Sequence, residues 1–223
     1  MFVVLYAILI VFESLFGNRK LSEVGPDYEN MGRNLDVPLR HIEYMDPNFS
    51  MDGFIRDLTN MTNTILDAYE KRDYESLSGV FHKKMLLAQS EIIRRYIEKE
   101  LYPHYLDREF SSFSIVFYQI MEGHERLDAH FEISLYEFVL DGNGQVVCGD
   151  NRNRSIMKCD VCVQRPKGAK TPAAKTIYCE QCGAALDNPA GKCPYCGCVT
   201  IAHNLGWELI SISFDDSTTW GNI

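Results

Sequence analysis

The sequence lacks the motifs of several common enzyme classes. It contains no glycine-rich phosphate-binding loop, no Gly-x-Ser-x-Gly element of serine hydrolases and no His-Glu-x-x-His motif of zinc proteases. Positive charge is also scarce, since 22 lysines and arginines stand against 31 acidic residues and give a formal net charge of −9. A surface of that sign repels phosphate backbones, so the composition argues against a general nucleic-acid-binding protein.

Long apolar runs are few, and the clearest one lies at the N-terminus. Residues 1–12 are apolar without a break, which is short against the ~20 residues that a membrane-spanning helix needs. No basic segment precedes this run and no clear small-x-small cleavage site follows it, so a cleaved signal peptide fits poorly. We expect residues 1–17 to anchor the chain in a membrane, with a buried or interfacial helix as the alternative. Arg19 and Lys20 favour a cytoplasmic location for the rest of the chain.

The hydrophobic period predicts helices first and strands afterwards. Residues 18–45 carry scattered glycines and prolines without a sustained period, and we expect a linker there. Apolar spacings of three and four residues follow, and beyond Pro103 the spacing changes to two. Helices are expected at about 54–69, 74–81 and 83–102, and strands at about 112–117, 127–140, 145–164 and 207–214. Helices followed by an antiparallel sheet form an α+β fold.

Three local features refine this layout. Ser50 or Asp52 is expected to cap the first helix. The apolar phase of the second strand slips at Leu135–Tyr136, which predicts a β-bulge in a long, bent strand. Asp141–Gly144 predicts a hairpin turn, and the polar residues 149–154 are expected to interrupt the returning strand.

Four of the eight cysteines form two matching turns. Cys179 and Cys182, like Cys193 and Cys196, are spaced Cys-x-x-Cys and followed by glycine. Such a turn brings two thiolates to one metal, and the glycine lets the backbone pass through φ > 0 so that its amides face the sulfurs. Together the two turns predict one structural Zn²⁺ in a closed site, within a zinc ribbon spanning residues 176–200. A redox pair and an iron cluster are the competing interpretations.

The remaining cysteines are expected to play other roles. Cys159 and Cys162 lie in a β-branched segment, where positions three apart point to opposite faces of a strand. We expect them to be strand residues, and a larger metal site that includes them is the alternative. Cys148 and Cys198 are expected to be small apolar residues, although Cys198 lies close enough to replace a ligand. Reduced thiolates agree with a cytoplasmic location.

The globular part resembles a known family. Asp46–Ser50, with the helix ending at Asp67–Asp73, resembles the opening of the C-terminal domain of mitochondrial import translocase subunit 44. Bacterial proteins with this domain are more closely similar, and several carry a zinc ribbon before a last strand containing Trp-x-Leu. Arg165–Thr171, the two cysteine turns and Trp207–Leu209 follow that order here. The resemblance covers residues 46–214 and leaves 215–223 as a tail.

The resemblance implies both a fold and a role. The fold is a cone of the cystatin or nuclear-transport-factor-2 type, with helices packed on a curved antiparallel sheet and the zinc ribbon inserted before the last strand. The role is membrane association and, in the mitochondrial member, a scaffold that ties a chaperone motor to a translocation channel. We therefore expect a non-enzymatic, membrane-associated binding or scaffold protein with an unidentified protein partner.

Two alternatives remain open. A ligand-binding or enzymatic cone would use Asp128 and His130, but both alternate with the apolar residues of their strand and are expected to lie on the surface. A nucleic-acid-binding ribbon is not expected, because Lys192 is the only basic residue between Cys179 and Cys198. A basic segment before the ribbon is expected to be solvated or to contact anionic lipid head groups. It comprises Arg165, Lys167, Lys170 and Lys175.

Overall fold

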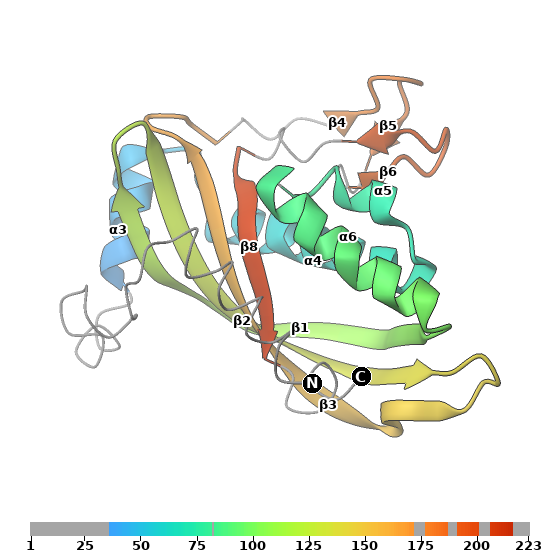
Figure 1. Ribbon diagram of the computed structural model, residues 1–223. Coiled ribbons are helices and arrows are strands. Elements are labelled where there is room, and N and C mark those ends of the chain that lie inside the picture. Colours follow the sequence, from blue (N-terminus) through green and yellow to red (C-terminus); the bar gives the residue numbers. More distant parts are fainter. Residues whose placement is uncertain (1–35, 82, 172–176, 187–190, 201–205, 216–223) are drawn as a thin grey trace. The chain divides into compact units, whose positions relative to one another are not determined.

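The computed structural model describes residues 36–81, 83–171, 177–186, 191–200 and 206–215 (Figure 1). The membrane anchor expected at residues 1–17 and nearly all of the expected C-terminal tail lie outside these residues. No helix in the described part of the chain is long and apolar enough to cross a membrane.

A helix occupies the second part of the expected linker. The helices are α3 (Asp36–Met45), α4 (Met51–Lys71), α5 (Tyr74–Leu77) and α6 (Lys83–Glu98). The prediction of a linker up to residue 45 was therefore wrong for α3. Pro38 stands in its first turn, where a missing backbone N–H costs no hydrogen bond. Ile42 of α3 is fully buried in the core, so this helix is an integral part of the fold.

The helix α4 agrees with the periodicity of the sequence. Ser50 is its N-cap, and the Ser50 hydroxyl accepts a hydrogen bond of 3.1 Å from the amide of Gly53. The helix ends at Arg72, which adopts the left-handed conformation with φ 53°. Its predicted apolar stripe is buried throughout and consists of Phe54, Leu58, Met61, Ile65 and Tyr69.

The next two helices end earlier than expected. α5 stops at Leu77 and α6 at Glu98. Glu100 then takes a left-handed conformation with φ 51°, and the amide of Leu101 donates to the carbonyl of Tyr96 at 2.8 Å. Tyr102 already belongs to the first strand, so the chain leaves α6 to enter the sheet.

Four strands pair in the antiparallel order β1-β2-β3-β8 (Figure 1). Their bounds are Tyr102–Ile120 for β1, His124–Leu140 for β2, Val146–Pro166 for β3 and Glu208–Asp215 for β8. The register of β2 against β3 shifts between Leu135 and Glu137, which confirms the predicted bulge. The predicted turn at Asp141–Gly144 joins these two strands, with the amide of Gly144 donating to the carbonyl of Asp141 at 3.0 Å.

The polar segment 149–154 does not end β3. Asp150 pairs with Glu137 and Ser155 with Leu135, so the residues between Asp150 and Ser155 leave the ladder as a bulge while the strand continues. Gly149 makes this possible. Its φ is +76°, and a Cβ atom there would lie 2.2 Å from the carbonyl oxygen of Glu137.

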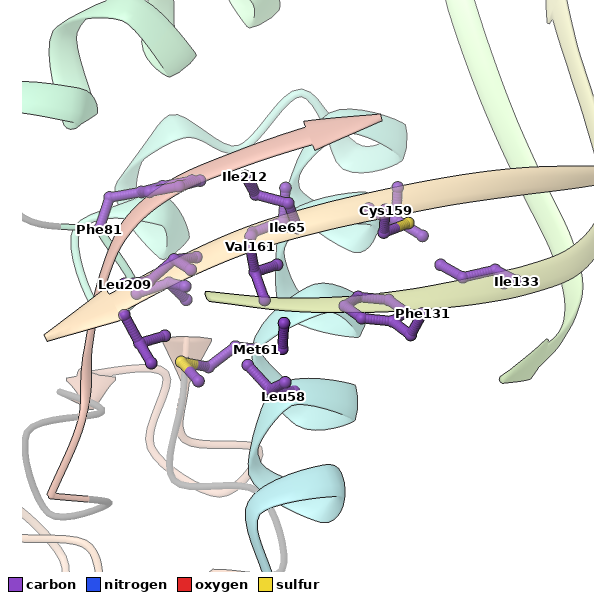
Figure 2. Close-up of a cluster of buried hydrophobic side chains, with 14 of the residues drawn as sticks. Leu58, Met61, Ile65, Phe81, Phe131, Ile133, Cys159, Val161, Leu209 and Ile212 are labelled. Atoms are coloured by element: carbon purple, nitrogen blue, oxygen red, sulfur yellow. The ribbon is translucent and has the colours of Figure 1, made fainter. Parts of the chain in front are cut away.

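The main core lies between α4 and one face of the sheet. Figure 2 shows Leu58 and Met61 of α4 close to Phe131 of β2 and Val161 of β3. Along β2 the odd-numbered positions from Glu125 to Leu135 are buried and the even ones are more exposed. The fold is therefore a mixed one, with helices on an antiparallel sheet, as expected.

A small unit interrupts the chain between β3 and β8, which are neighbours in the main sheet. It contains two short hairpins. In the first, β4 (Ile177–Tyr178) pairs with β5 (Ala185–Leu186), and in the second, β6 (Gly191–Lys192) pairs with β7 (Val199–Thr200). We call the described residues 177–186 and 191–200 the cysteine module.

Cysteine cluster and buried arginine network

Each hairpin of the cysteine module closes with the same turn. The amide of Gly183 donates to the carbonyl of Cys179 at 2.8 Å, and the amide of Gly197 donates to that of Cys193 at 2.9 Å. The two glycines have φ values of +72° and +73°. The turns therefore have the geometry that the Cys-x-x-Cys-Gly pattern predicts.

The two turns bring their four sulfur atoms together. The Sγ atoms of Cys179, Cys182, Cys193 and Cys196 all lie within 4.8 Å of one another. Cys179 and Cys196 are 3.7 Å apart, and Cys182 and Cys193 are 3.8 Å apart. A tetrahedral ion with metal–sulfur bonds of ~2.3 Å separates its sulfurs by ~3.8 Å. The four cysteines fit one metal ion.

The electrostatics of the cluster favour a thiolate at Cys179, whereas burial and hydrogen bonds with neighbouring thiols raise the pKa of Cys182 and Cys196. A hydrogen bond from the backbone amide of Cys182 lowers the pKa of the Cys179 thiol to about 6. The thiolate is the form of cysteine that binds metals. One side of the cluster is buried, since Cys179 and Cys193 are each 2% exposed, whereas Cys182 and Cys196 face solvent.

The other cysteines take the places expected from the sequence, with one addition. Cys159 points into the core and Cys162 lies half-buried on the opposite face of β3, and burial raises the pKa of both thiols. Neither belongs to the four-sulfur group. Cys198 lies beside it, with its Sγ 3.3 Å from those of Cys179 and Cys196.

Lys192 connects the cysteine module to the helices. Its Nζ lies 2.8 Å from a carboxylate oxygen of Asp73 and 3.2 Å from one of Glu75. Asp73 is the N-cap of α5 and accepts a hydrogen bond of 3.1 Å from the amide of Glu75. Lys192 is thus engaged with acidic groups.

A buried arginine stands where a solvated basic segment was expected. Arg165 is 2% exposed. Its Nη1 lies 2.5 Å from Asp46 and its Nε lies 2.7 Å from Glu125, while its guanidinium stacks 4.3 Å from the ring centre of Trp207. Nη2 has no hydrogen-bond partner among the described residues. The prediction that Arg165 is free to contact lipid was therefore wrong, because it lies on the buried face of β3 with Val163.

Further donors complete this network. The amide and hydroxyl of Thr171 donate to Asp46 at 2.8 and 2.7 Å, and the amide of Gly168 donates to Glu125 at 2.9 Å. Burial opposes ionisation of both carboxyls, but these hydrogen bonds and Arg165 outweigh it and lower the pKa of each. We call Asp46, Glu125, Arg165 and Thr171 the arginine network.

The rest of the basic segment is only partly described. Lys167 is exposed, Lys170 binds the carbonyl of Met45, and Lys175 lies outside the described residues. The hypothesis of contact with anionic lipid therefore still applies to two described lysines, Lys167 and Lys170.

Asp128 and His130 lie on the outer face of β2, as predicted. Asp128 accepts hydrogen bonds from Arg126 at 2.8 and 2.9 Å, and His130 Nδ1 lies 2.9 Å from Asp160. An open pocket of about 470 Å³ lies elsewhere, at the end of the sheet near the arginine network. Its lining comprises Gly123, His124, Gln164, Arg165, Pro166, Gly206, Trp207 and Glu208.

The sequence motifs do not predict the arginine network, although the strand phase of two of its residues indicates that they are buried. Glu125 has the same strand phase as the buried Leu127, and Arg165 has that of the buried Val163. A charged residue in phase with a buried stripe implies a buried partner of opposite charge. The strand phase of Arg165 is therefore a sign in the sequence that it pairs with an acidic residue.

The fold and these sites define an α+β domain, with helices on an antiparallel sheet, that carries an inserted cluster of cysteines. Residues 36–173 match the Tim44-like domain family. This is more than half of the chain, and the protein belongs to that family. The match begins with α3, earlier than the resemblance at residue 46 implied, and it ends before the cysteine module.

Two further comparisons add little. No curated protein sequence is significantly similar to this chain. Among solved structures, the intermembrane space region of chloroplast protein ARC6 is similar, with 12% identity and a TM-score of 0.37 over 71% of this chain and 94% of that one.

Proposed function

We propose that this protein is a non-enzymatic binding or scaffold protein of the Tim44-like family, held at the cytoplasmic face of a membrane by its N-terminal segment. The arginine network is the observation that carries this proposal. Its two buried carboxylates, Asp46 and Glu125, receive hydrogen bonds from Arg165 of β3 and from the backbone amides of Gly168 and Thr171 in the segment after it. Carboxylates that accept hydrogen bonds from the protein in this way stabilise the fold around them. They are not free to act as an acid or a base on a substrate.

The enzymatic and nucleic-acid alternatives have weaker support. Asp128 and His130 are bound to neighbouring side chains on the outer face of β2 and do not line the pocket. Lys192, the only basic residue between Cys179 and Cys198, faces Asp73 and Glu75. A phosphate backbone would have to displace both carboxylates to reach it.

The cysteine module is proposed to be a zinc ribbon with a structural Zn²⁺. The buried apolar cluster of the described module consists of Cys179, Leu186 and Cys193, with Cys198 packed against it. So small a core cannot fold a module alone, whereas structural zinc sites contribute on the order of 10 kcal/mol. Four thiolates with tetrahedral spacing and no open position suit a structural ion rather than a catalytic one.

The sheet is proposed to curve as in the cystatin-like and nuclear-transport-factor-2-like cones. Support comes from its irregular ladders. The pairing of β1 with β2 shifts at three places, and that of β2 with β3 shifts at Leu135–Glu137 and again at Val139–Leu140. Bulges of this kind bend strands and increase their twist.

The membrane role is tested with the full chain and a variant that lacks residues 1–17. Both are expressed with a photo-crosslinker at exposed Leu87 of α6, and membranes are separated from the soluble fraction. We expect the full chain in the membrane fraction, crosslinked to a membrane protein, and the shortened chain in the soluble fraction. Equal distribution of the two chains would contradict the proposal.

The lipid contact is a separate test. Full chains carrying Lys167→Glu and Lys170→Glu are compared with the unaltered chain on phosphatidylcholine vesicles with and without phosphatidylglycerol. We expect the anionic lipid to strengthen binding and the two substitutions to remove that gain. Binding that does not depend on anionic lipid would show that these lysines do not contact head groups.

A further inference from the structure

The cysteine module contains one thiol more than a tetrahedral ion can bind. Cys198 Sγ lies 3.3 Å from the Sγ atoms of both Cys179 and Cys196. This is closer than Cys179 and Cys196 lie to each other, at 3.7 Å. Cys198 is half-buried and packs against the small core of the module. The fifth sulfur therefore lies directly beside the group of four.

The two hairpins show that the turn itself needs no cysteine at this position. The amide of Cys179 donates to the carbonyl of Ala184, and the amide of Cys193 donates to that of Cys198, both at 2.8 Å. Ala184 and Cys198 thus occupy equivalent places, each directly after the glycine of its turn. Because alanine closes the first turn, the sulfur of Cys198 adds a chemical group that the backbone does not require.

We propose that Cys198 is a reserve ligand that replaces Cys196 at the metal. Of the two cysteines nearest to Cys198, Cys179 is buried and Cys196 is exposed. An exposed thiolate is the ligand that electrophiles and oxidants in solution reach first. Cys198 lies on the same turn and needs only a small movement to reach the ion.

The exchange conserves atoms and charge. The sulfur of Cys198 binds the metal as the bond from Cys196 breaks, and the proton of the Cys198 thiol passes to the departing thiolate. The coordination number stays four and no electron is transferred. The turn has space to adjust, because no described atom outside residues 196–198 lies within 4 Å of the position that a Cβ of Gly197 would occupy.

This inference rests on the metal site proposed above, and one set of variants of the full chain tests both. The variants are C196A, C198A, C182A and the double variant C196A/C198A. Zinc per chain is measured by elemental analysis, and affinity by competition with a chromophoric chelator. In addition, Co²⁺ replaces zinc, because the intensity of its sulfur charge-transfer absorption reports the number of bound thiolates.

We expect the unaltered chain and C198A to bind one ion with the same affinity. C196A retains one ion and the absorption of four thiolates, because Cys198 completes the site. C182A and the double variant retain three thiolates and lose on the order of a hundredfold in affinity. C198A is the matched control, since it converts the second turn into the first.

The outcomes separate the two proposals. If C196A loses affinity as C182A does while the unaltered chain binds one ion, the reserve ligand is disproved and the metal site stands. If the unaltered chain binds no ion, both proposals fail.

A second measurement covers the case in which C196A misfolds. Cys198 is alkylated with iodoacetamide in the zinc-loaded unaltered chain and in C196S, which keeps nearly the size of the native side chain. We expect zinc to protect Cys198 in C196S but not in the unaltered chain. Equal reactivity in the two proteins would overturn the inference.

Discussion

The arginine network and the cysteine cluster use different means to hold neighbouring parts of one chain. The network joins Asp46, Glu125 and Arg165 through charges and hydrogen bonds that the protein itself supplies. The cluster gathers thiols that repel one another as thiolates until an ion binds them. Trp207, which stacks on Arg165, belongs to the main core, whereas the module has its own small cluster.

The contact between Arg165 and Trp207 explains how the cysteine module can be inserted into the main domain without disrupting the arginine network. Arg165 lies at the end of β3 and Trp207 immediately precedes β8, so the two residues stand where the chain leaves the sheet and where it returns. Their stacking at 4.3 Å closes the insertion at its base. The β3–β8 ladder and this stacking lie outside the cysteine module, so we expect the main sheet to form without the metal and the module to fold as a loop closed at its base.

Removal of the metal is expected to have the largest effect, confined to the module. If the module binds the proposed zinc, a chelator should abolish the hydrogen-exchange protection of residues 177–186 and 191–200, because binding free energy on the order of 10 kcal/mol is lost there. Amides of β1, β2 and β3 should keep their protection. Added zinc restores the module as the control, and loss of protection throughout the sheet would show that the two regions are not independent.

The substitution Arg165→Met is expected to have the next largest effect, this time on the main domain. It leaves the buried carboxylates of Asp46 and Glu125 without their cation, which costs about 3–5 kcal/mol of unfolding free energy. Urea unfolding in the presence of chelator measures this loss.

The matched control for that experiment is Lys167→Met, which also replaces a cationic side chain with methionine, at an exposed position two residues away. It should alter the unfolding free energy by no more than about 0.5 kcal/mol. Equal effects of the two substitutions would mean that the network does not stabilise the domain.

The same contrast separates what the sequence could and could not predict. The apolar stripe of α4, the bulge at Leu135–Glu137, the Asp141–Gly144 turn and the two cysteine turns all arise from patterns within a few residues. Period and turn chemistry report such short-range structure directly. The cysteine cluster therefore followed from spacing alone.

The arginine network depends on contacts between distant residues. Asp46 and Arg165 are 119 positions apart, and no local pattern relates them. Lysines near Arg165 made it resemble part of a solvated basic segment, while its strand phase was the only sign of burial. The helix α3 was missed for a related reason, because its stability comes from burial of Ile42 against residues far along the chain.

Acid is expected to act on the network in a defined direction. The pKa values of Asp46 and Glu125 are lowered from ordinary values of 3.8 and 4.5. A carboxyl with a lowered pKa stabilises the folded state fully above its unfolded pKa and loses that contribution as the pH falls through the folded value. The unfolding free energy should therefore decline below about pH 4.5.

The measurement is urea unfolding from pH 7 to pH 3 in chelator, so that protonation of the metal ligands does not contribute. Glu125→Gln should flatten this decline, because it removes one of the two titrating carboxyls of the arginine network. Asp128→Asn, on the outer face of the same strand, controls for the loss of one carboxylate from β2. A steeper decline in Glu125→Gln would contradict the assignment.

The smallest expected effect concerns Lys192. This residue links the cysteine module to the main domain by contacting Asp73, the N-cap of α5, and Glu75 within α5. Lys192 and Asp73 are partly buried and Glu75 is exposed. Ion pairs near the surface contribute at most about 1 kcal/mol, so Lys192→Met should leave the metal content unchanged and lower the global unfolding free energy by no more than about 1 kcal/mol. It should still speed hydrogen exchange at the start of α5, because Asp73 loses the cation that helps to orient it as the helix cap.

Lys71→Met, which removes a comparable ion pair of 3.0 Å with Asp67 on α4, is the control and should leave α5 unaffected. Loss of zinc in Lys192→Met would mean that docking on α5, and not the four thiols alone, holds the cluster together.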